Sequence, residues 1–257
     1  MTLLGLHNPF DAPVYYIETV SSTMDVSRNL AGAGEPHGTV ITAGFQEAGR
    51  GRGCGRVWEM ERGLNLPFTV LLRFPSVEAI PAALTLRTGL AVSLAVEEFA
   101  PSLSSRVFVK WPNDILIDSK KLAGIICEAD GGNVHIGIGV NFAQKEFPVH
   151  LQEKAVSVVL ASGCSFSQDD RYVLLEKILI QLHSELAEVQ DDSNFWKACL
   201  EKRLYKNGEQ VVFIEGAAGS GKEIKGHLAG VGSCGELLIV PDGETTARSY
   251  VTGELKI

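Results

Sequence analysis

The sequence predicts an α+β fold, in which helices pack on a mixed, largely antiparallel sheet and a small all-β segment follows. Two observations carry this prediction. Three strand-like runs in the middle of the chain are separated only by short polar turns, which is typical of an antiparallel meander. Beyond Lys206, glycine-rich turns divide short β-patterned runs, a texture that suits a small β-barrel. We therefore divide the chain into domains of residues 1–206 and 207–257.

Helices are predicted from capping residues and from apolar side chains that recur at helical spacing. Ser22 offers an N-cap with Asp25 three positions later, and Pro81 suits the first turn of a second helix. The predicted helices cover residues 23–31, 81–99, 169–189 and 194–204.

Strands are predicted where β-branched and aromatic residues run between turn residues. In the first domain they cover residues 39–45, 64–74, 107–111, 115–117, 122–129 and 134–140. In the tail they cover residues 211–215, 224–230, 236–240 and 247–257. Residues 1–20 are expected to contain one short strand at most.

Composition argues against several classes of protein. The formal net charge is −8, so the surface as a whole repels nucleic acids and anionic membranes. Five scattered cysteines without CxxC spacing disfavour a disulfide framework or a zinc site. No apolar stretch approaches the roughly 18 to 20 residues that a membrane helix needs, and residues 1–10 do not resemble a secretory signal. We expect a reduced, cytoplasmic enzyme.

The most informative stretch is residues 49–58, which we call the Gly-Arg loop because glycine and arginine alternate there before Trp58. Glycine lets the backbone approach a ligand closely, and arginine presents a planar fork that suits phosphate and carboxylate. Such a loop has few apolar side chains to bury, so we expect it to be mobile when empty and to order around a polyanion. The alternative, a solvated surface turn, suits one Gly-Arg pair better than three.

Two further stretches carry residues suited to ligand binding. In Lys-Trp-Pro-Asn-Asp, Pro112 ends a strand, so Lys110 and Asp114 lie where that strand opens at a sheet edge. The Lys110 ammonium either points inward at an anion or snorkels to water, and the spacing leaves both open. In Gly-Ile-Gly-Val-Asn, the glycines allow a flat ligand to approach and Asn141 can pair with a purine edge.

Residues 216–222 imitate a phosphate-binding P-loop. The spacing fits as far as Lys222, but Glu223 follows where magnesium binding needs Ser or Thr. The next residues are β-patterned and supply no helix dipole for a phosphate. We predict a hairpin turn at this position.

Together, these motifs resemble the biotin protein ligase family, of the monofunctional type. The motifs are Gly-Arg-Gly-Arg from Gly49, Lys-Trp-Pro-Asn-Asp from Lys110, Lys-Leu-Ala-Gly from Lys121 and Gly-Ile-Gly-Val-Asn ending at Asn141. The resemblance covers about residues 17–142, and Thr-Gly-Glu-Leu from Thr252 is similar to the end of that family's small barrel. It implies a class II synthetase-like catalytic domain with an SH3-like barrel. It also implies formation of biotinyl-5'-AMP from biotin and ATP, and transfer of biotin to a lysine of a carrier protein.

The resemblance implies a role for each matching residue. Biotin would be bound by Ser22, Thr23, Gln46, Arg50, Gly51, Arg52, Lys110 and Gly124. ATP or the adenylate would be bound by Arg50, Arg52, Arg56, Trp58, Lys121 and Asn141. Arg52 and Lys110 would act on the reacting groups, and Asp114 is a candidate to orient or deprotonate the acceptor lysine.

The chain departs from the family pattern at two places. Gly53 and Cys54 make the loop one residue longer, so the roles of Arg56 and Trp58 carry over less directly. Met24 stands where the family favours asparagine, which leaves that contact either to the backbone or absent.

The expected cofactors and partners follow from the same resemblance. ATP with Mg²⁺ and biotin would be substrates, with no tightly bound protein metal. The partner would be a biotin carboxyl carrier protein or domain, with no DNA and no membrane, and the enzyme a monomer or homodimer. Because only 21 residues precede the Ser-Thr motif at Ser22, we expect no winged-helix domain ahead of it. Two alternatives remain, a lipoate-type ligase of the same fold and a non-catalytic biotin-binding module; the arginine-rich loop disfavours the first, and the phosphate-facing cations disfavour the second.

Overall fold

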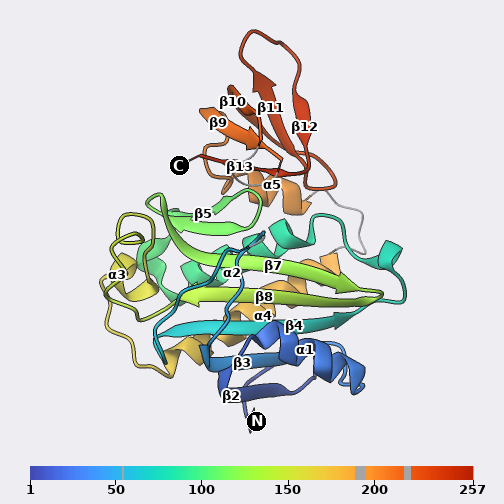
Figure 1. Cartoon of the computed structure of the whole chain (residues 1–257), viewed down its shortest axis with the longest axis vertical. Coiled ribbons are helices and arrows are strands. Elements are labelled where there is room, and N and C mark those ends of the chain that lie inside the picture. Colours follow the sequence, from blue (N-terminus) through green and yellow to red (C-terminus); the bar gives the residue numbers. More distant parts are fainter. Residues whose placement is uncertain (54, 189–194, 217–220, 257) are drawn as a thin grey trace.

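The structure, a computed structural model, describes residues 1–53, 55–188, 195–216 and 221–256. Within these ranges one large sheet has the strand order β1-β2-β3-β4-β8-β7-β6-β5 (Figure 1). Its strands are β1 (Thr2–Leu4), β2 (Val14–Val20), β3 (Thr39–Gln46), β4 (Asn65–Arg73), β5 (Val107–Lys110), β6 (Asp114–Ile117), β7 (Lys120–Asp130) and β8 (Asn133–Asn141). A smaller sheet follows near the β5 edge.

The large sheet is mixed but mostly antiparallel, as predicted. Strands β6, β7 and β8 form the expected meander, because the short polar turns between them reverse the chain directly. Strand β2 pairs parallel to β3, which requires a crossover, and helix α1 (Thr23–Gly32) supplies it. Consequently, the carboxyl ends of β2 and β3 lie side by side at the same end of the sheet.

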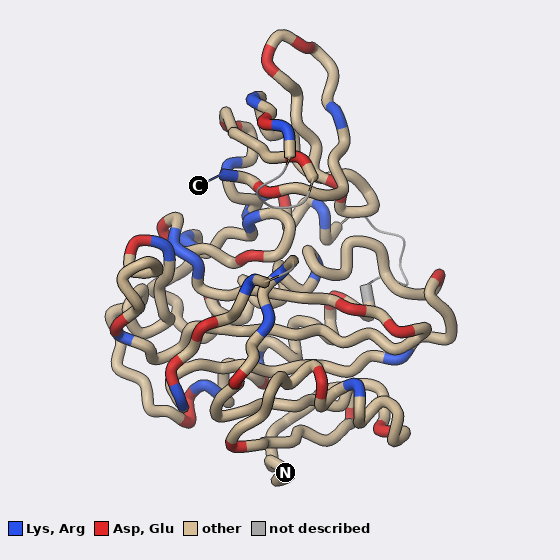
Figure 2. Tube along the Cα trace, in the orientation of Figure 1, with Lys and Arg blue, Asp and Glu red and all other residues tan. Residues whose placement is uncertain are grey.

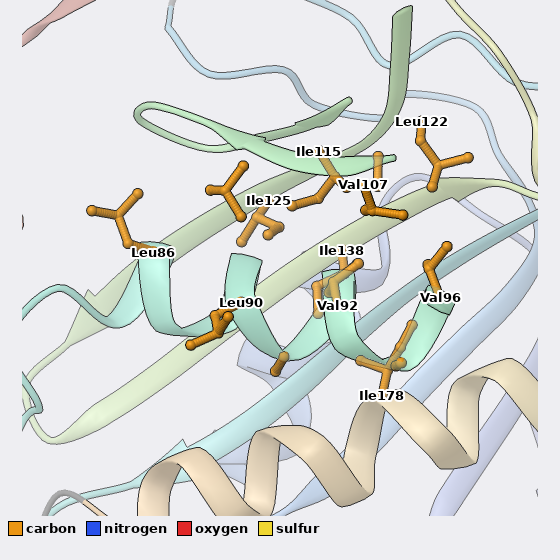
Figure 3. Packing of buried hydrophobic residues seen from close by; sticks show 14 of the residues in the cluster. Leu86, Leu90, Val92, Val96, Val107, Ile115, Leu122, Ile125, Ile138 and Ile178 are labelled. Carbon is orange, nitrogen blue, oxygen red and sulfur yellow. The ribbon is translucent and has the colours of Figure 1, made fainter. Parts of the chain in front are cut away.

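Helices pack on both faces of this sheet. Helix α1 contacts β3, β4 and β8, while α2 (Leu84–Phe99) lies between the sheet and α4 (Asp170–Glu188) (Figure 3). Leu90, Val92 and Val96 of α2 are fully buried against strand residues such as Ile115 and Ile138. Two shorter helices are α3 (Val158–Ser162) and α5 (Phe195–Glu201), and α5 contacts both α2 and the second sheet.

One segment corrects the expectation about membrane helices. Val77–Phe99 is long enough to cross a membrane, and an 18-residue stretch within it has a mean hydropathy of 1.6. Since 61% of that stretch is buried inside the protein, its apolar character matches that of a core helix packed between other elements.

The second sheet has the order β12-β11-β10-β9-β13. Its strands are β9 (Gln210–Glu215), β10 (Glu223–Val231), β11 (Leu237–Pro241), β12 (Arg248–Tyr250) and β13 (Gly253–Leu255). It falls wholly within residues 207–257, although the domain boundary itself remains a prediction. Lysine and arginine, like aspartate and glutamate, are spread over both sheets (Figure 2).

Four features differ from the expected elements. Two strands, β1 and β2, lie in residues 1–20, where at most one was expected, and α3 was not predicted. Helix α2 begins at Leu84 rather than at Pro81, because Ala83 adopts a left-handed backbone with φ 57°. The run 247–257 divides into β12 and β13, which pair with β11 and β9 on opposite sides of the sheet.

Other expectations fall partly outside the described residues. Helix α4 is described to Glu188 and α5 from Phe195, so the predicted ends at Val189 and Asn194 lie outside the described ranges. Strands β9 and β10, on either side of the P-loop imitation, pair antiparallel. Glu215 donates its backbone N–H to the Lys222 carbonyl at 3.0 Å, so the described ends close a hairpin; residues 217–220 are not described.

Candidate functional site

The floor of the candidate site is a face of the sheet from which side chains are missing. Gly124 on β7 lies opposite Gly139 on β8, and Gly137 is on the same face of β8. Trp58 lies on this surface: a Cβ added at Gly139 would stand 2.7 Å from the indole. A Cβ added at Gly137 would stand 2.8 Å from the Met24 sulfur. The glycines are therefore required by the close approach of these two side chains.

One end of the floor carries neutral polar groups, positioned by the parallel pair β2 and β3. Ser22 follows β2 and caps α1, accepting from the Met24 backbone N–H at 3.3 Å. Gln46 ends β3, and its Oε1 accepts from the Thr23 backbone N–H at 2.8 Å and from the Thr23 hydroxyl at 3.0 Å. Thr69 in turn donates to the Thr23 hydroxyl at 2.8 Å. These bonds leave the Gln46 amide nitrogen as a donor beside the cavity.

The Gly-Arg loop is a short ladder above this floor. Trp58 donates its backbone N–H to the Gly49 carbonyl at 2.9 Å, and Gly51 donates to the Arg56 carbonyl at 2.8 Å. A Cβ at Gly51 would stand 2.8 Å from the Arg56 Cβ, so glycine is needed where the two sides approach. Cys54, the inserted residue, lies outside the described residues.

The three loop arginines have different partners. Arg50 pairs with Asp25 on α1, and Arg52 donates to the Gly253 carbonyl at 3.1 Å. Arg56 pairs with Glu254 on β13 at 2.7 Å. The second sheet thus provides the partners of two of these cations.

Burial and neighbouring charge perturb two of these groups. Burial lowers the pKa of Arg52, and Arg56 adds to this while Glu254 opposes it. Burial also opposes ionisation of Glu254, but the hydrogen bond from Arg56 and the charges of Arg56, Lys110 and Arg52 hold its pKa below the ordinary value.

The β5–β6 hairpin brings in the remaining cations. Lys110 and Asp114 are cross-strand partners at its closed end, and Asp114 pairs with Lys121 at 2.6 Å. Lys110 is only 4% exposed, which contradicts the snorkelling alternative. Burial lowers the pKa of Lys110, although Asp114 and Glu254 favour its charged form. A buried ammonium near carboxylates and guanidinium groups is suited to hold an anion.

The other end of the site is larger and more apolar. A cavity of about 660 Å³ lies between Trp58, Asn141 and the 147–155 segment, which contributes Phe147 and Leu151. Asn141 donates to the Lys121 and Val156 carbonyls, each at 3.2 Å, so its carbonyl oxygen keeps acceptor capacity. The Lys121 ammonium lies 5.6 Å from the centre of the Trp58 ring. This volume and lining suit a nucleotide-sized ligand.

All residues to which the resemblance assigned a role in binding or catalysis line three adjoining cavities, which share Trp58 and Lys121. They are Ser22, Thr23, Gln46, Arg50, Gly51, Arg52, Arg56, Trp58, Lys110, Asp114, Lys121, Gly124 and Asn141. Sequence reasoning missed two residues that contact the loop, Asp25 and Glu254. The first carried a signal as an acid in the first turn of a predicted helix. The second lay in the Thr-Gly-Glu-Leu motif but was given no role.

The arrangement can accommodate one extended molecule. Neutral donors and acceptors lie at one end, cations in the middle, and an aromatic and apolar compartment at the other end. This order suits an organic acid with a neutral polar head whose carboxylate meets a nucleotide phosphate between Arg52 and Lys110.

Comparison with known proteins agrees with this arrangement. A family model described as the Biotin/lipoate A/B protein ligase family matches residues 16–142. The biotin–[acetyl-CoA-carboxylase] ligase of Paracoccus denitrificans is 32% identical over 213 residues, which are 77% of this chain and 82% of that protein. The bifunctional ligase/repressor BirA of Bacillus subtilis is 36% identical over 172 residues, or 64% of this chain. The chain spans about half the length of that relative, 51%.

Solved structures give the same result for the fold. The biotin protein ligase of Aquifex aeolicus, solved in complex with biotin and ATP, has a TM-score of 0.78 and 28% sequence identity to this chain. The match covers 95% of this chain and 97% of that one.

Proposed function

Because the chain belongs to the Biotin/lipoate A/B protein ligase family, we propose that it is an ATP-dependent biotin protein ligase. The observation that carries the proposal is the order of groups along one continuous set of cavities. Neutral polar groups, which suit a ureido ring, are followed by cations, which suit a carboxylate and a phosphate, and then by a more apolar compartment that suits adenine.

We assign biotin to the glycine floor. Ser22, Thr23 and the Gln46 amide would bond its ureido ring, and the thiophane ring would lie near Gly124. Its carboxylate would reach Lys110 and the Gly51–Arg52 backbone at the mouth of the second cavity. The Met24 side chain would contribute an apolar contact, as its packing on Gly137 supports.

In the first step, a carboxylate oxygen of biotin attacks the α-phosphorus of ATP, and the bond to pyrophosphate breaks. Two anions must approach each other, so the reaction needs fixed positive charge at their meeting point. Arg50, Arg52 and Lys110 would supply it in a site with little water. Arg56 and Lys121 would contact the phosphates, while Trp58 and Asn141 would hold the adenine.

Magnesium would arrive with ATP as part of the substrate. Among the described residues no cluster of three or more histidine, cysteine or acidic side chains is placed to hold a metal. The second cavity, which is lined by several arginines and lysines, we call the cationic cavity. Asp114 and Glu254 are the carboxylates that line it, so they are the groups that would face a nucleotide-bound cation.

In the second step, the ε-amine of an acceptor lysine attacks the carbonyl carbon of the adenylate. The carbon–oxygen bond to AMP breaks, AMP leaves, and the amine loses a proton. A free lysine amine has a pKa near 10.4, so it is mostly protonated at neutral pH. Asp114, beside Lys110 and Lys121, is our candidate to orient the amine or accept its proton. The acceptor would be a biotin carboxyl carrier domain of a carboxylase.

The test is transfer of labelled biotin to an acceptor domain in the presence of ATP and magnesium. We expect labelled acceptor and release of one AMP for each biotin transferred. Parallel reactions with lipoate and an excess of unlabelled biotin separate this activity from lipoate ligation. Binding of biotin without AMP release would identify a non-catalytic module and overturn the proposal.

A further inference from the structure

Asp25 contacts the Gly-Arg loop from outside the cavities described above. It lies in the first turn of α1, three residues after the capping Ser22. Its Oδ1 accepts from the Arg50 guanidinium and also from Arg28, the latter at 2.8 Å. Arg28 in turn pairs with Glu128 on β7. A series of ion pairs therefore connects Glu128 on the large sheet, through Arg28 and Asp25 on α1, to Arg50 on the loop.

In this series of ion pairs Arg28 is held by two partners, whereas Arg50 on the loop is held by one. Arg28 is held from both sides, by Asp25 and by Glu128, so the Asp25 carboxylate has a fixed anchor on its own helix. Arg50 is joined to Asp25 through one terminal nitrogen, Nη2. Arg50 also lines the first cavity, and a guanidinium has five N–H donors in one plane. One edge can therefore stay on Asp25 while the other donors face a ligand anion.

The same helix turn serves the neutral end of the site. Ser22 and Thr23 lie three and two residues before Asp25, and Thr23 is fixed by Gln46 and Thr69. Any movement of this turn would shift the polar partners of the substrate and the anchor of the loop together. The loop is bonded at its other side by Gly253 and Glu254. Asp25 on α1 therefore holds one side of the loop, and the second sheet holds the other side.

We propose that Asp25 is a positioning residue that latches the Gly-Arg loop through Arg50 and so retains the activated intermediate. It acts before ligand arrives, by holding the loop over the glycine floor, in contrast to the expectation from the sequence of a loop that is mobile when empty. The retention of an intermediate rests on the proposed function, whereas the latch itself does not.

A double-mutant cycle with tryptic cleavage tests the latch in the ligand-free protein. We expect trypsin to cleave after Arg52 and Arg56 chiefly when the loop opens, so the rate of these two cuts, measured separately from any cut after Arg50, reports the open population. Asp25→Ala should raise this rate about two- to five-fold, the scale of a partly exposed ion pair. In an Arg50→Ala background the same substitution should add nothing, because the pair is already broken.

Controls separate a latch from a general structural effect. Glu244→Ala removes a carboxylate of similar exposure, 38% against 37%, from an arginine pair on the second sheet, and cleavage of the loop should not change. Asp25→Glu keeps the charge on the same turn and should restore most of the protection. An equal increase of cleavage in both Arg50 backgrounds would overturn the proposal, since Asp25 would then act through α1 alone.

The second measurement is the release of biotinyl-5'-AMP from protein that was loaded with biotin and ATP. Asp25→Ala should shorten its half-life by a similar factor, with the rate of adenylate formation at saturating substrate less affected. An unchanged half-life together with faster cleavage would contradict the retention part of the proposal. If no variant, nor the parent protein, forms adenylate, the proposed function fails while the cleavage cycle still decides the latch.

Discussion

Lys110 shows how a single residue can be shaped by its surroundings. It ends an edge strand, yet it is almost fully buried, and it contacts the cationic cavity rather than solvent. Desolvation disfavours its charge, and the carboxylates of Asp114 and Glu254 compensate in part. An anion bound nearby would complete that compensation, so Lys110 should gain more from a ligand than a surface lysine would.

Replacing Lys110 by alanine should therefore weaken biotin binding markedly. We expect a loss of about 2 kcal/mol or more, the scale of a charge-assisted hydrogen bond left unmade. Titration calorimetry of Lys110→Ala and of the parent protein measures the difference. Equal affinities would return Lys110 to a purely structural role.

The lowered pKa of Lys110 also predicts a pH dependence. A lysine binds an anion only while it is protonated, which is below its pKa. Because burial moves this pKa below the ordinary 10.5, biotin affinity should begin to fall at a lower pH than for an unperturbed lysine. Lys110→Arg keeps its charge and should postpone the loss to higher pH. Identical alkaline profiles of the two proteins would rule out titration of Lys110 as the cause.

Arg52 leads to a prediction about the intermediate. Its guanidinium donates to the Gly253 carbonyl, and Arg52 lines both the first and the second cavity. Arg52→Gly would remove this link and a cation beside the phosphate, so the adenylate should escape faster. We expect labelling of lysines on unrelated proteins that are added to the reaction. If the variant keeps the adenylate as long as the parent does, Arg52 does not retain it.

At the level of elements, the floor formed by β7 and β8 depends on missing side chains. Gly139→Ala would place a methyl group 2.7 Å from the Trp58 ring, so the indole would have to move from the floor. Overpacking of this kind costs about 1 to 3 kcal/mol, and we expect it to appear as weaker nucleotide binding. Gly32→Ala, which meets nothing within 4 Å, is the matched control and should bind normally. Normal binding by Gly139→Ala would show that Trp58 is not held by this contact.

The elements also show what the sequence could and could not predict. The meander β6–β8 was predictable because its turns are short and its pairing is local, and the motifs at its ends marked the site. The range and pairing of β2 were not predicted, although one short strand was allowed in residues 1–20, because its parallel partner β3 lies beyond a helix and no turn signals the pairing. The division of residues 247–257 depends on Gly253, whose φ of 149° and contact with Phe213 follow from packing between distant strands. The ion pairs of Arg50 with Asp25 and of Arg28 with Glu128 likewise could not be predicted, because they join residues far apart in the sequence.

At the level of the whole molecule, the two sheets are joined next to the site. The Trp111 indole, 2% exposed, donates to the Gly235 carbonyl at 2.9 Å and packs edge-on against Phe213. The same sheet provides the partners of Arg52 and Arg56. Attachment of the second sheet and closure of the loop are therefore parts of one assembly.

Trp111→Phe tests this connection, because it removes the N–H and keeps an aromatic ring. The Gly235 carbonyl would lose its partner, and we expect the free energy of unfolding to fall by about 1 to 3 kcal/mol. Adenylate retention should fall as well, since the acceptors of the loop arginines would be less firmly placed. Denaturant unfolding and adenylate release measure the two effects. The control Lys222→Ala, at the β9–β10 hairpin, should change neither quantity. If Trp111→Phe retains the adenylate as long as the parent protein does, attachment of the second sheet through Trp111 does not affect the loop.

The long separation along the chain between the loop and its partners has a consequence in time. Arg52 and the Gly253 carbonyl are 201 residues apart. At 5 to 20 residues per second, a ribosome takes roughly 10 to 40 s to synthesise that interval. A nascent chain can thus display the loop arginines long before their acceptors exist. During that interval the chain lacks the contacts of Arg52 and Arg56 with the second sheet, so it should not fully retain a reactive acyl phosphate until the last strand has been made.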